Sequence, residues 1–166
     1  IFDIPSQVAK TIKVILSIKS IKYFTIHALG SLEMLLAAKK AAAGSSLEFL
    51  AVSVLTSWNK NNLEEIGIVN NVKDQVKKLI KLSTQANLSG VIASAQDINI
   101  VREISKDIKI FCPGIRGDQN VQDQKRTLSY KEFNNISDEK CFAVIGRPIY
   151  EGDPLENIKK IINSAR

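Results

Sequence analysis

The run Phe49-Leu50-Ala51-Val52-Ser53-Val54-Leu55 is almost continuously apolar, and it ends at the polar pair Thr56-Ser57. Its length suits a β-strand, and the absence of alternating polar residues indicates a strand that is buried on both faces. Strands of this kind are typical of parallel sheets that are covered by helices. This stretch therefore predicts an α/β fold.

The sequence on either side alternates between short apolar runs and segments with helical periodicity. We predict further strands at 23–27, 91–93, 108–111 and 142–145, and Ile1-Phe2 as the tail of an earlier strand. The residues expected to form buried helix faces are Val8, Ile12, Ile15 and Leu16; Leu32, Leu35 and Leu36; Val72, Val76, Leu79 and Ile80; Ile100, Val101 and Ile104; and Leu155, Ile158, Ile161 and Ile162.

Capping residues suggest where several helices begin and end. Ser31 is expected to cap the second helix, which closes at Gly44, and a short helix is expected near 129–134. Asp153 before Pro154 predicts the start of the last helix. The pattern as a whole predicts one domain over residues 1–166 with a parallel sheet. A doubly wound sheet of five strands fits this pattern as well as a barrel wall does.

Composition narrows the functional classes. No apolar run approaches the length that spans a bilayer, so we expect no membrane partner. The net charge of +6 suits nucleic acid or a phosphorylated small molecule. The lysines fall mainly where helices should face solvent, and aromatic residues are not interleaved with them as a single-strand binding surface requires. We therefore expect a small phosphorylated ligand rather than nucleic acid.

The two cysteines are expected to be reduced. Cys112 ends one predicted strand and Cys141 begins the next, which puts them at opposite ends of neighbouring parallel strands and too far apart for a disulfide. Reduced cysteines favour a cytoplasmic location.

Polar residues, glycines and prolines follow the predicted strands, at the ends that line the ligand site in parallel α/β folds. These segments are Asp3-Ile4-Pro5, His27-Ala28, Thr56-Ser57, Pro113-Gly114-Ile115-Arg116 and Gly146-Arg147-Pro148. Each of them alone is a weak signal, because glycine and proline also simply end strands.

Together and in this order, the segments resemble the orotidine 5′-phosphate decarboxylase family of the bacterial type. The family signature is D-x-K-x-x-D-I-P-x-T, and Ile1-Phe2-Asp3-Ile4-Pro5-Ser6-Gln7 corresponds to it from just after the lysine. Gln7 replaces the signature threonine, which puts one ribose contact in doubt. The other matching blocks are Val54-Leu55-Thr56-Ser57, Ser94-Ala95-Gln96, Pro113-Gly114-Ile115-Arg116, Asp123-Gln124-Lys125-Arg126 and Ile145-Gly146-Arg147-Pro148.

The resemblance implies a (β/α)₈ TIM barrel, present here as an incomplete barrel from the end of strand 3 to the helix after strand 8. It also implies decarboxylation of orotidine 5′-phosphate to uridine 5′-phosphate in pyrimidine biosynthesis, without metal or organic cofactor. The implied partners are this nucleotide and a second subunit of a homodimer. The catalytic lysine of the family would lie before Ile1, so this chain alone is expected to be inactive.

The resemblance also assigns roles to individual residues. Asp3 corresponds to a catalytic aspartate that reaches into the neighbouring subunit's site. The residues implied to bind the substrate are Ile4, Thr56 for the pyrimidine part, Arg116, and Gln124, Gly146 and Arg147 for the phosphate. A guanidinium suits the phosphate role because it forms paired, charge-assisted hydrogen bonds. His27 is expected to be a strand-end histidine in a satisfied hydrogen bond rather than a general base.

Two alternative functions stay open. The chain could be a degenerate or truncated product that binds nucleotide and catalyses nothing, or a related sugar-phosphate decarboxylase or aldolase. A lysine just before Ile1, preceded two residues earlier by aspartate, would support the enzyme, and a start codon at that point would support the remnant.

Overall fold

The computed structural model describes residues 1–117 and 126–165. Its main sheet has five parallel strands, as the sequence predicts, with boundaries that shift by up to three residues. The strands of this sheet are β1 (Tyr23–His27), β2 (Glu48–Val52), β3 (Gly90–Ile92), β4 (Lys109–Pro113) and β7 (Cys141–Val144). A second, two-stranded sheet, which was not predicted, pairs β5 (Ile115–Arg116) with β6 (Leu128–Ser129).

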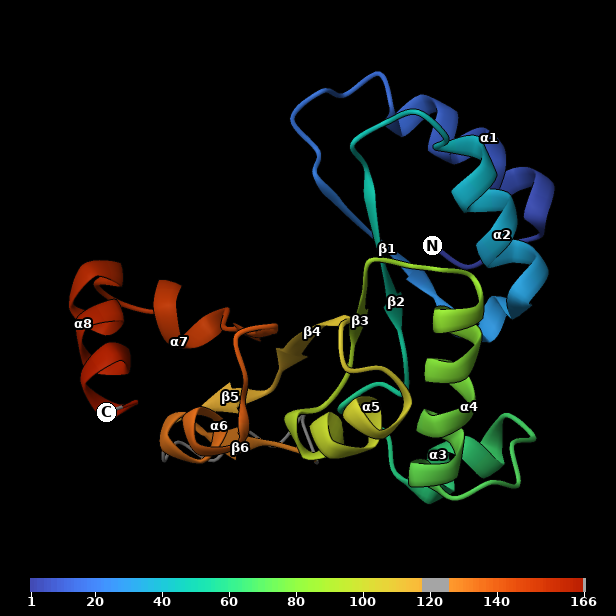
Figure 1. The fold of residues 1–166 in the computed structure, drawn as a ribbon. Coiled ribbons are helices and arrows are strands. Elements are labelled where there is room, and N and C mark those ends of the chain that lie inside the picture. The colour runs from blue at the N-terminus through green and yellow to red at the C-terminus, as the bar shows by residue number, and fades with distance from the viewer. Residues whose placement is uncertain (118–125, 166) are drawn as a thin grey trace.

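Helices connect these strands along the chain (Figure 1). The α-helices of the described residues are α1 (Pro5–Ile15), α2 (Ser31–Ala41), α3 (Lys60–Glu65), α4 (Val72–Gln85), α5 (Ile98–Ile104), α6 (Tyr130–Ile136), α7 (Arg147–Tyr150) and α8 (Pro154–Ser164). Two 3₁₀ turns, η1 (Ala28–Gly30) and η2 (Ala95–Asp97), follow β1 and β3. Of the described helices, none is long and apolar enough to traverse a lipid bilayer.

The strand order decides between the two architectures that the sequence allows. The main sheet runs β1-β2-β3-β4-β7, so its strands follow one another in sequence without a reversal. Right-handed crossovers between strands in such an order place every connecting helix on the same face. A doubly wound sheet reverses its order and places helices on both faces. Accordingly, α1 packs on α2, α2 on α4 and α4 on α5 in one layer, as in a barrel wall (Figure 1).

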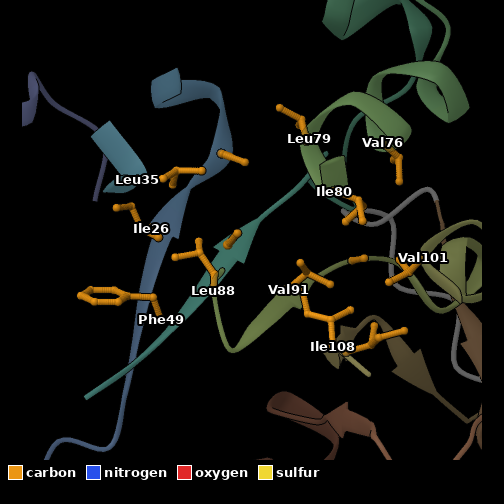
Figure 2. Packing of buried hydrophobic residues seen from close by; sticks show 14 of the residues in the cluster. Ile26, Leu35, Phe49, Val76, Leu79, Ile80, Leu88, Val91, Val101 and Ile108 are labelled. Carbon is orange, nitrogen blue, oxygen red and sulfur yellow. The ribbon is translucent and has the colours of Figure 1, made fainter. Parts of the chain in front are cut away.

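The hydrophobic core lies between this helix layer and the sheet (Figure 2). Ile26, Phe49 and Val91 contribute from the strands, and Leu35 and Ile80 contribute from the helices. Each of these side chains is less than 2% exposed, and burying one stabilises the fold by about 1.5–3 kcal/mol. The helical faces predicted for α1, α2 and α4 supply much of this core, but the predicted burial of Leu36 on α2 is wrong because this side chain is 46% exposed.

The predicted burial of the last helix is wrong. In α8, Leu155, Ile158 and Ile162 are 72%, 38% and 51% exposed, and only Ile161 packs against the core. The physical reason is that the main contacts of α8 are with α6 and α7, and the described sheet has no strand beyond β7 against which this helix could also pack. Its apolar stripe therefore faces solvent in this chain.

The capping predictions have mixed outcomes. The Asp153 carboxylate accepts hydrogen bonds from the backbone amides of Leu155 at 2.9 Å and Glu156 at 3.3 Å, which confirms the start of α8. Ser31 is not a cap, because it is the first residue of α2 and makes no capping hydrogen bond. Its φ of +76° is instead set by the preceding 3₁₀ turn.

The two edge strands of the main sheet differ in how far they are covered by other parts of the chain. Beside β1, the Ile1 amino group donates to the carbonyl of Thr25 and the amide of His27 donates to the carbonyl of Ile1, both at 2.9 Å. Ile1 thus continues the ladder as the predicted strand tail would. At the other edge, Phe142 and Val144 of β7 are 41% and 45% exposed.

The cysteines are free, as expected, although they lie closer together than predicted. Cys112 is opposite Ala143, and Cys141 is opposite Ile110, so the two cysteines are two residues apart along the strands. Burial raises the pKa of the Cys112 thiol to about 12, which makes it a poor nucleophile.

Candidate functional site

The candidate site is at the carboxyl ends of the main-sheet strands. Because all five strands are parallel, these ends share one edge of the sheet. In barrels of this architecture, the loops that leave this edge carry the ligand-binding residues. Thr56 follows β2 and Gly146 follows β7, each in a loop at that edge, and Arg116 lies in the short strand β5 directly after β4.

Thr56 lines a small pocket at this edge. The pocket has a volume of about 240 Å³, and its walls include Val54, Thr56, Ser57, Ile92, Ala93 and Pro113. These residues come from the ends of β2, β3 and β4. Thr56 is only 8% exposed, and its neighbours are largely apolar. A mostly apolar pocket with the two hydroxyl residues Thr56 and Ser57 at its wall suits a flat, partly polar ring such as a pyrimidine.

The backbone around Thr56 is held by Arg126. The Arg126 Nη2 group donates to the carbonyl of Val54 at 2.9 Å and, at the longer distance of 3.4 Å, to that of Leu55. The Arg126 backbone amide donates to the carbonyl of Thr56 at 3.3 Å. One residue therefore bonds three consecutive carbonyl oxygens next to the pocket.

Asp97, at the end of η2, pairs with the other end of the same guanidinium. Arg126 Nη1 lies 2.6 Å from Asp97 Oδ2, and the two side chains are 12% and 5% exposed. Burial raises the pKa of the Asp97 carboxyl, and the charge of Arg126 opposes that rise. We take the carboxyl as ionised at neutral pH, because the short contact to a permanent cation stabilises the charged form.

Arg116 is buried in β5, directly after a turn that depends on glycine. Gly114 adopts a φ of +82°, which side-chain-bearing residues rarely adopt, and its carbonyl accepts a hydrogen bond from Leu128. The turn redirects the chain from β4 into β5, where Arg116 lies opposite Ser129 of β6. Arg116 is 8% exposed, so it occupies the interior of this loop region rather than open solvent.

The residues expected to bind phosphate are only partly described. Gly146 precedes α7 and its carbonyl accepts a hydrogen bond from Ile149 at 2.8 Å. Arg147 is the first residue of that helix and is half-buried. Gln124 lies outside the described residues. Convergence of these three residues therefore stays a prediction.

Asp3 and Ile4 lie in a different place from Thr56. They line a broad, open depression of about 430 Å³ with Phe2, Leu29 and Gly30, just before α1 and beside η1. The Asp3 carboxylate accepts a hydrogen bond from the amide of Ile4 at 2.7 Å, and Ile4 is 60% exposed. The chain thus brings Asp3 and Ile4 together but does not bring them into the Thr56 pocket.

His27 has the structural role that the sequence suggests. Its Nδ1 atom accepts a hydrogen bond from the amide of Leu29 at 3.2 Å and thereby caps η1. Burial lowers the pKa of His27, so the imidazole is neutral at physiological pH. Within residues 1–117 and 126–165, no three His, Cys, Asp or Glu side chains are grouped so that they could hold a metal ion.

Sequence reasoning missed the pairing of Arg126 with Asp97. Arg126 stands in the quoted block with Gln124, but it received no role, and Asp97 was not singled out. The available signal was the charge itself, since Arg126 ends one quoted block and Asp97 directly follows another, Ser94-Ala95-Gln96. Their separation of 29 residues gives no local pattern that would reveal the contact.

A sequential parallel sheet, a single helix layer and a ligand-sized pocket at the carboxyl edge define a protein of the (β/α)₈-barrel class. Comparisons with known proteins narrow this class. Residues 1–161 match the family described as Orotidine 5′-phosphate decarboxylase / HUMPS family. The chain belongs to this family, which is named in part for a decarboxylase of pyrimidine biosynthesis.

Relatives in this family match almost the whole chain. The orotidine 5′-phosphate decarboxylase of Wolbachia pipientis subsp. Culex pipiens is 37% identical over 166 residues, which cover 99% of this chain and 72% of that protein. The enzyme of the same name from Ehrlichia chaffeensis is 38% identical, with 98% and 70% covered. The crystal structure of orotidine 5′-phosphate decarboxylase from Lactobacillus acidophilus superposes with a TM-score of 0.79 at 27% identity and covers 100% of this chain and 72% of that one.

Proposed function

We propose that the protein containing this chain decarboxylates orotidine 5′-phosphate to uridine 5′-phosphate. The observation that carries the proposal is the similarity to decarboxylases at 37–38% identity across nearly the whole chain. The pocket beside Thr56 supports it, because its size and its largely apolar walls suit the pyrimidine ring.

In this proposal different residues of the chain bind different parts of the substrate. Thr56 contacts the pyrimidine, while Gln124, Gly146 and Arg147 bind the phosphate, and Arg116 adds a further contact. Glycine lets backbone amides approach the phosphate oxygens, and the Arg147 guanidinium neutralises their charge. Binding energy from the phosphate is then used at the reacting ring, far from the phosphate itself.

The part of the site that surrounds the leaving carboxylate needs charged residues that are not among these 166. Asp3, with Ile4 beside it, belongs to an array of lysines and aspartates that stabilises the negative charge developing at the ring carbon as carbon dioxide leaves. A lysine at the position before Ile1 then protonates that carbon. Asp3 acts in the site of a neighbouring subunit, which makes the working enzyme a homodimer and accounts for its distance from the Thr56 pocket.

The test compares the full-length protein with the isolated 166-residue chain. We expect the full-length protein to release labelled carbon dioxide from carboxyl-labelled orotidine 5′-phosphate, and the isolated chain to release none because it has no lysine before Asp3. A hexulose 6-phosphate serves as the control substrate for a sugar-phosphate enzyme. Amino-terminal sequencing and the intact mass of the native protein establish whether a lysine precedes Ile1. Turnover of the sugar phosphate alone, or a native protein that begins at Ile1 and turns over neither substrate, would overturn the proposal.

A further inference from the structure

We propose that Arg126 is a positioning residue, which together with Asp97 holds the backbone that carries Thr56. The inference rests on the proposed function only for the identity of the ligand that Thr56 contacts. In this inference Arg126 binds no ligand itself, and it fixes the position of Thr56, which does.

Arg126 bonds mainly to the backbone around Thr56. Its guanidinium bonds the carbonyls of Val54 and Leu55, and its backbone amide bonds the carbonyl of Thr56. These carbonyls belong to the turn that leaves β2, where the amide of Trp58 also donates to Leu55 at 2.9 Å. The orientation of the Thr56 side chain in the pocket depends on this backbone.

The segment of residues 126–127 is also fixed to the end of β3. The Ser94 hydroxyl donates to the carbonyl of Arg126 at 3.3 Å, and the Gln96 side-chain amide donates to the carbonyl of Thr127 at 3.2 Å. With the ion pair to Asp97, residues 126–127 connect the ends of β2 and β3, which form two walls of the Thr56 pocket. Displacing Arg126 would loosen both walls.

The buried ion pair between Arg126 and Asp97 carries a desolvation cost. Burying an arginine and an aspartate requires removing both charges from water, and apolar residues of similar size often stabilise a fold as well or better. A buried ion pair is therefore weak evidence of a stabilising role alone. At the edge of a ligand pocket, a rigid guanidinium with directed donors is suited to holding several carbonyls in one arrangement.

Burial and the existing contacts of the two Nη atoms argue against direct ligand binding by Arg126, whose Nε is buried and has no hydrogen-bond partner among the described residues. Nη1 donates to Asp97 at 2.6 Å, and Nη2 donates to the Val54 carbonyl at 2.9 Å. The neighbouring carboxylate neutralises the charge that would attract a phosphate. Replacing Arg126 should therefore change ligand affinity only by moving Thr56. The lost affinity should be for the base rather than for the phosphate.

Arg102 provides a matched control. It also pairs with an aspartate, Asp138, and also donates to two backbone carbonyls, those of Ser105 and Ile108. It lies at the amino-terminal end of β4, opposite the pocket. Arg102→Met and Arg126→Met thus remove the same chemical group from the two ends of the same sheet.

The first experiment measures amide hydrogen exchange in the ligand-free, full-length protein. We expect Arg126→Met to accelerate exchange of the Trp58 amide about tenfold, the equivalent of roughly one hydrogen bond, and to leave the Ile110 amide unchanged. Arg102→Met should have the reverse effect, because Ile110 donates to Lys140 at that other end. Equal acceleration at both amides by Arg126→Met would show a merely global role and overturn the inference. Arg126→Lys, which retains the charge beside Asp97, replaces the Met variant if that variant does not fold.

The second experiment measures binding of uridine 5′-phosphate and of ribose 5-phosphate, which lacks the base. Arg126→Met should weaken the nucleotide about tenfold and leave ribose 5-phosphate unchanged, and Thr56→Val should add little in the Arg126→Met background. Arg102→Met should change neither affinity. Equal weakening of both ligands, or additive effects with Thr56→Val, would overturn the inference. A wild-type protein that does not bind uridine 5′-phosphate would overturn the proposed function, while the exchange experiment still decides whether Arg126 positions Thr56.

Discussion

Arg102 and Asp138 form a two-point ion pair at the amino-terminal end of β4 and β7, opposite the candidate site. Arg102 Nε lies 2.5 Å from Asp138 Oδ2, and Nη2 lies 3.0 Å from Oδ1. Arg102 also donates to the carbonyl of Ile108 at 2.8 Å, directly before β4. The pair therefore connects α5 to the start of both strands, and its hydrogen bonds hold the pKa of Asp138 well below its usual range.

We predict that Asp138→Asn destabilises the full-length protein in a pH-dependent manner. Because the pKa of Asp138 is lower in the folded state than in the unfolded state, its contribution is complete above the unfolded pKa of about 4 and is lost as the pH falls through the folded pKa. Asp138 is 44% exposed, so the loss at pH 7 should be only about 1 kcal/mol. Urea unfolding at pH 7 and pH 3 measures it, and a difference that grows at pH 3 would contradict the prediction.

Gly90 in β3 should not tolerate a side chain. A Cβ atom there would lie 2.7 Å from Leu50 Cδ2 and 3.0 Å from the backbone oxygen of Lys109, which cannot move without disturbing β4. Gly90→Ala should therefore lower the free energy of unfolding by about 1–3 kcal/mol. Gly117→Ala is the control, because its Cβ would meet Tyr130 at an ordinary 3.4 Å. Chemical denaturation compares the two, and equal stabilities would show that the strands have room at Gly90.

Arg147→Ala should weaken binding of uridine 5′-phosphate by about 2–5 kcal/mol, because a charge-assisted contact to phosphate is lost. Uridine, which has no phosphate, should bind both proteins equally. Lys159→Ala on α8 removes a positive charge from an exposed surface pair with Glu156 and should have no effect on either ligand. Titration calorimetry on the full-length protein measures these affinities. Unchanged affinity for the nucleotide in Arg147→Ala would remove this residue from the phosphate site.

The isolated 166-residue chain should associate with itself. Phe142 and Val144 on the edge strand β7 are exposed, as is the apolar stripe of α8. Unpaired strand edges and large apolar patches favour pairing with another chain. Sedimentation of the purified chain should show dimers or aggregates, and Val144→Lys should reduce them because a charge on an edge strand opposes pairing. A compact, cooperatively melting monomer would contradict this expectation.

The five strands of the main sheet and most helices of this protein could be predicted from local sequence patterns, whereas the short strands β5 and β6 were not. The apolar run that begins at Phe49 encodes burial on both faces, and Asp153 before Pro154 encodes a helix start, since both effects act within a few residues. The end of β2 was less predictable. The strand stops at Val52 although Val54 and Leu55 are apolar, and the carbonyls of these two residues bond Arg126, which lies more than 70 residues away in sequence.

The sequence by itself thus determined the parallel α/β class, the family resemblance and the strand-end residues that the proposed site contains. Apolar periodicity left both a barrel wall and a doubly wound sheet open, because strand order is a property of pairing. The family resemblance implied the barrel, and the tertiary structure confirmed it through the strand order. Only the tertiary structure decided that the apolar stripe of α8 is exposed and that Arg126 pairs with Asp97. Both depend on which distant surfaces meet, whereas a sequence pattern reports only the environment that each segment prefers.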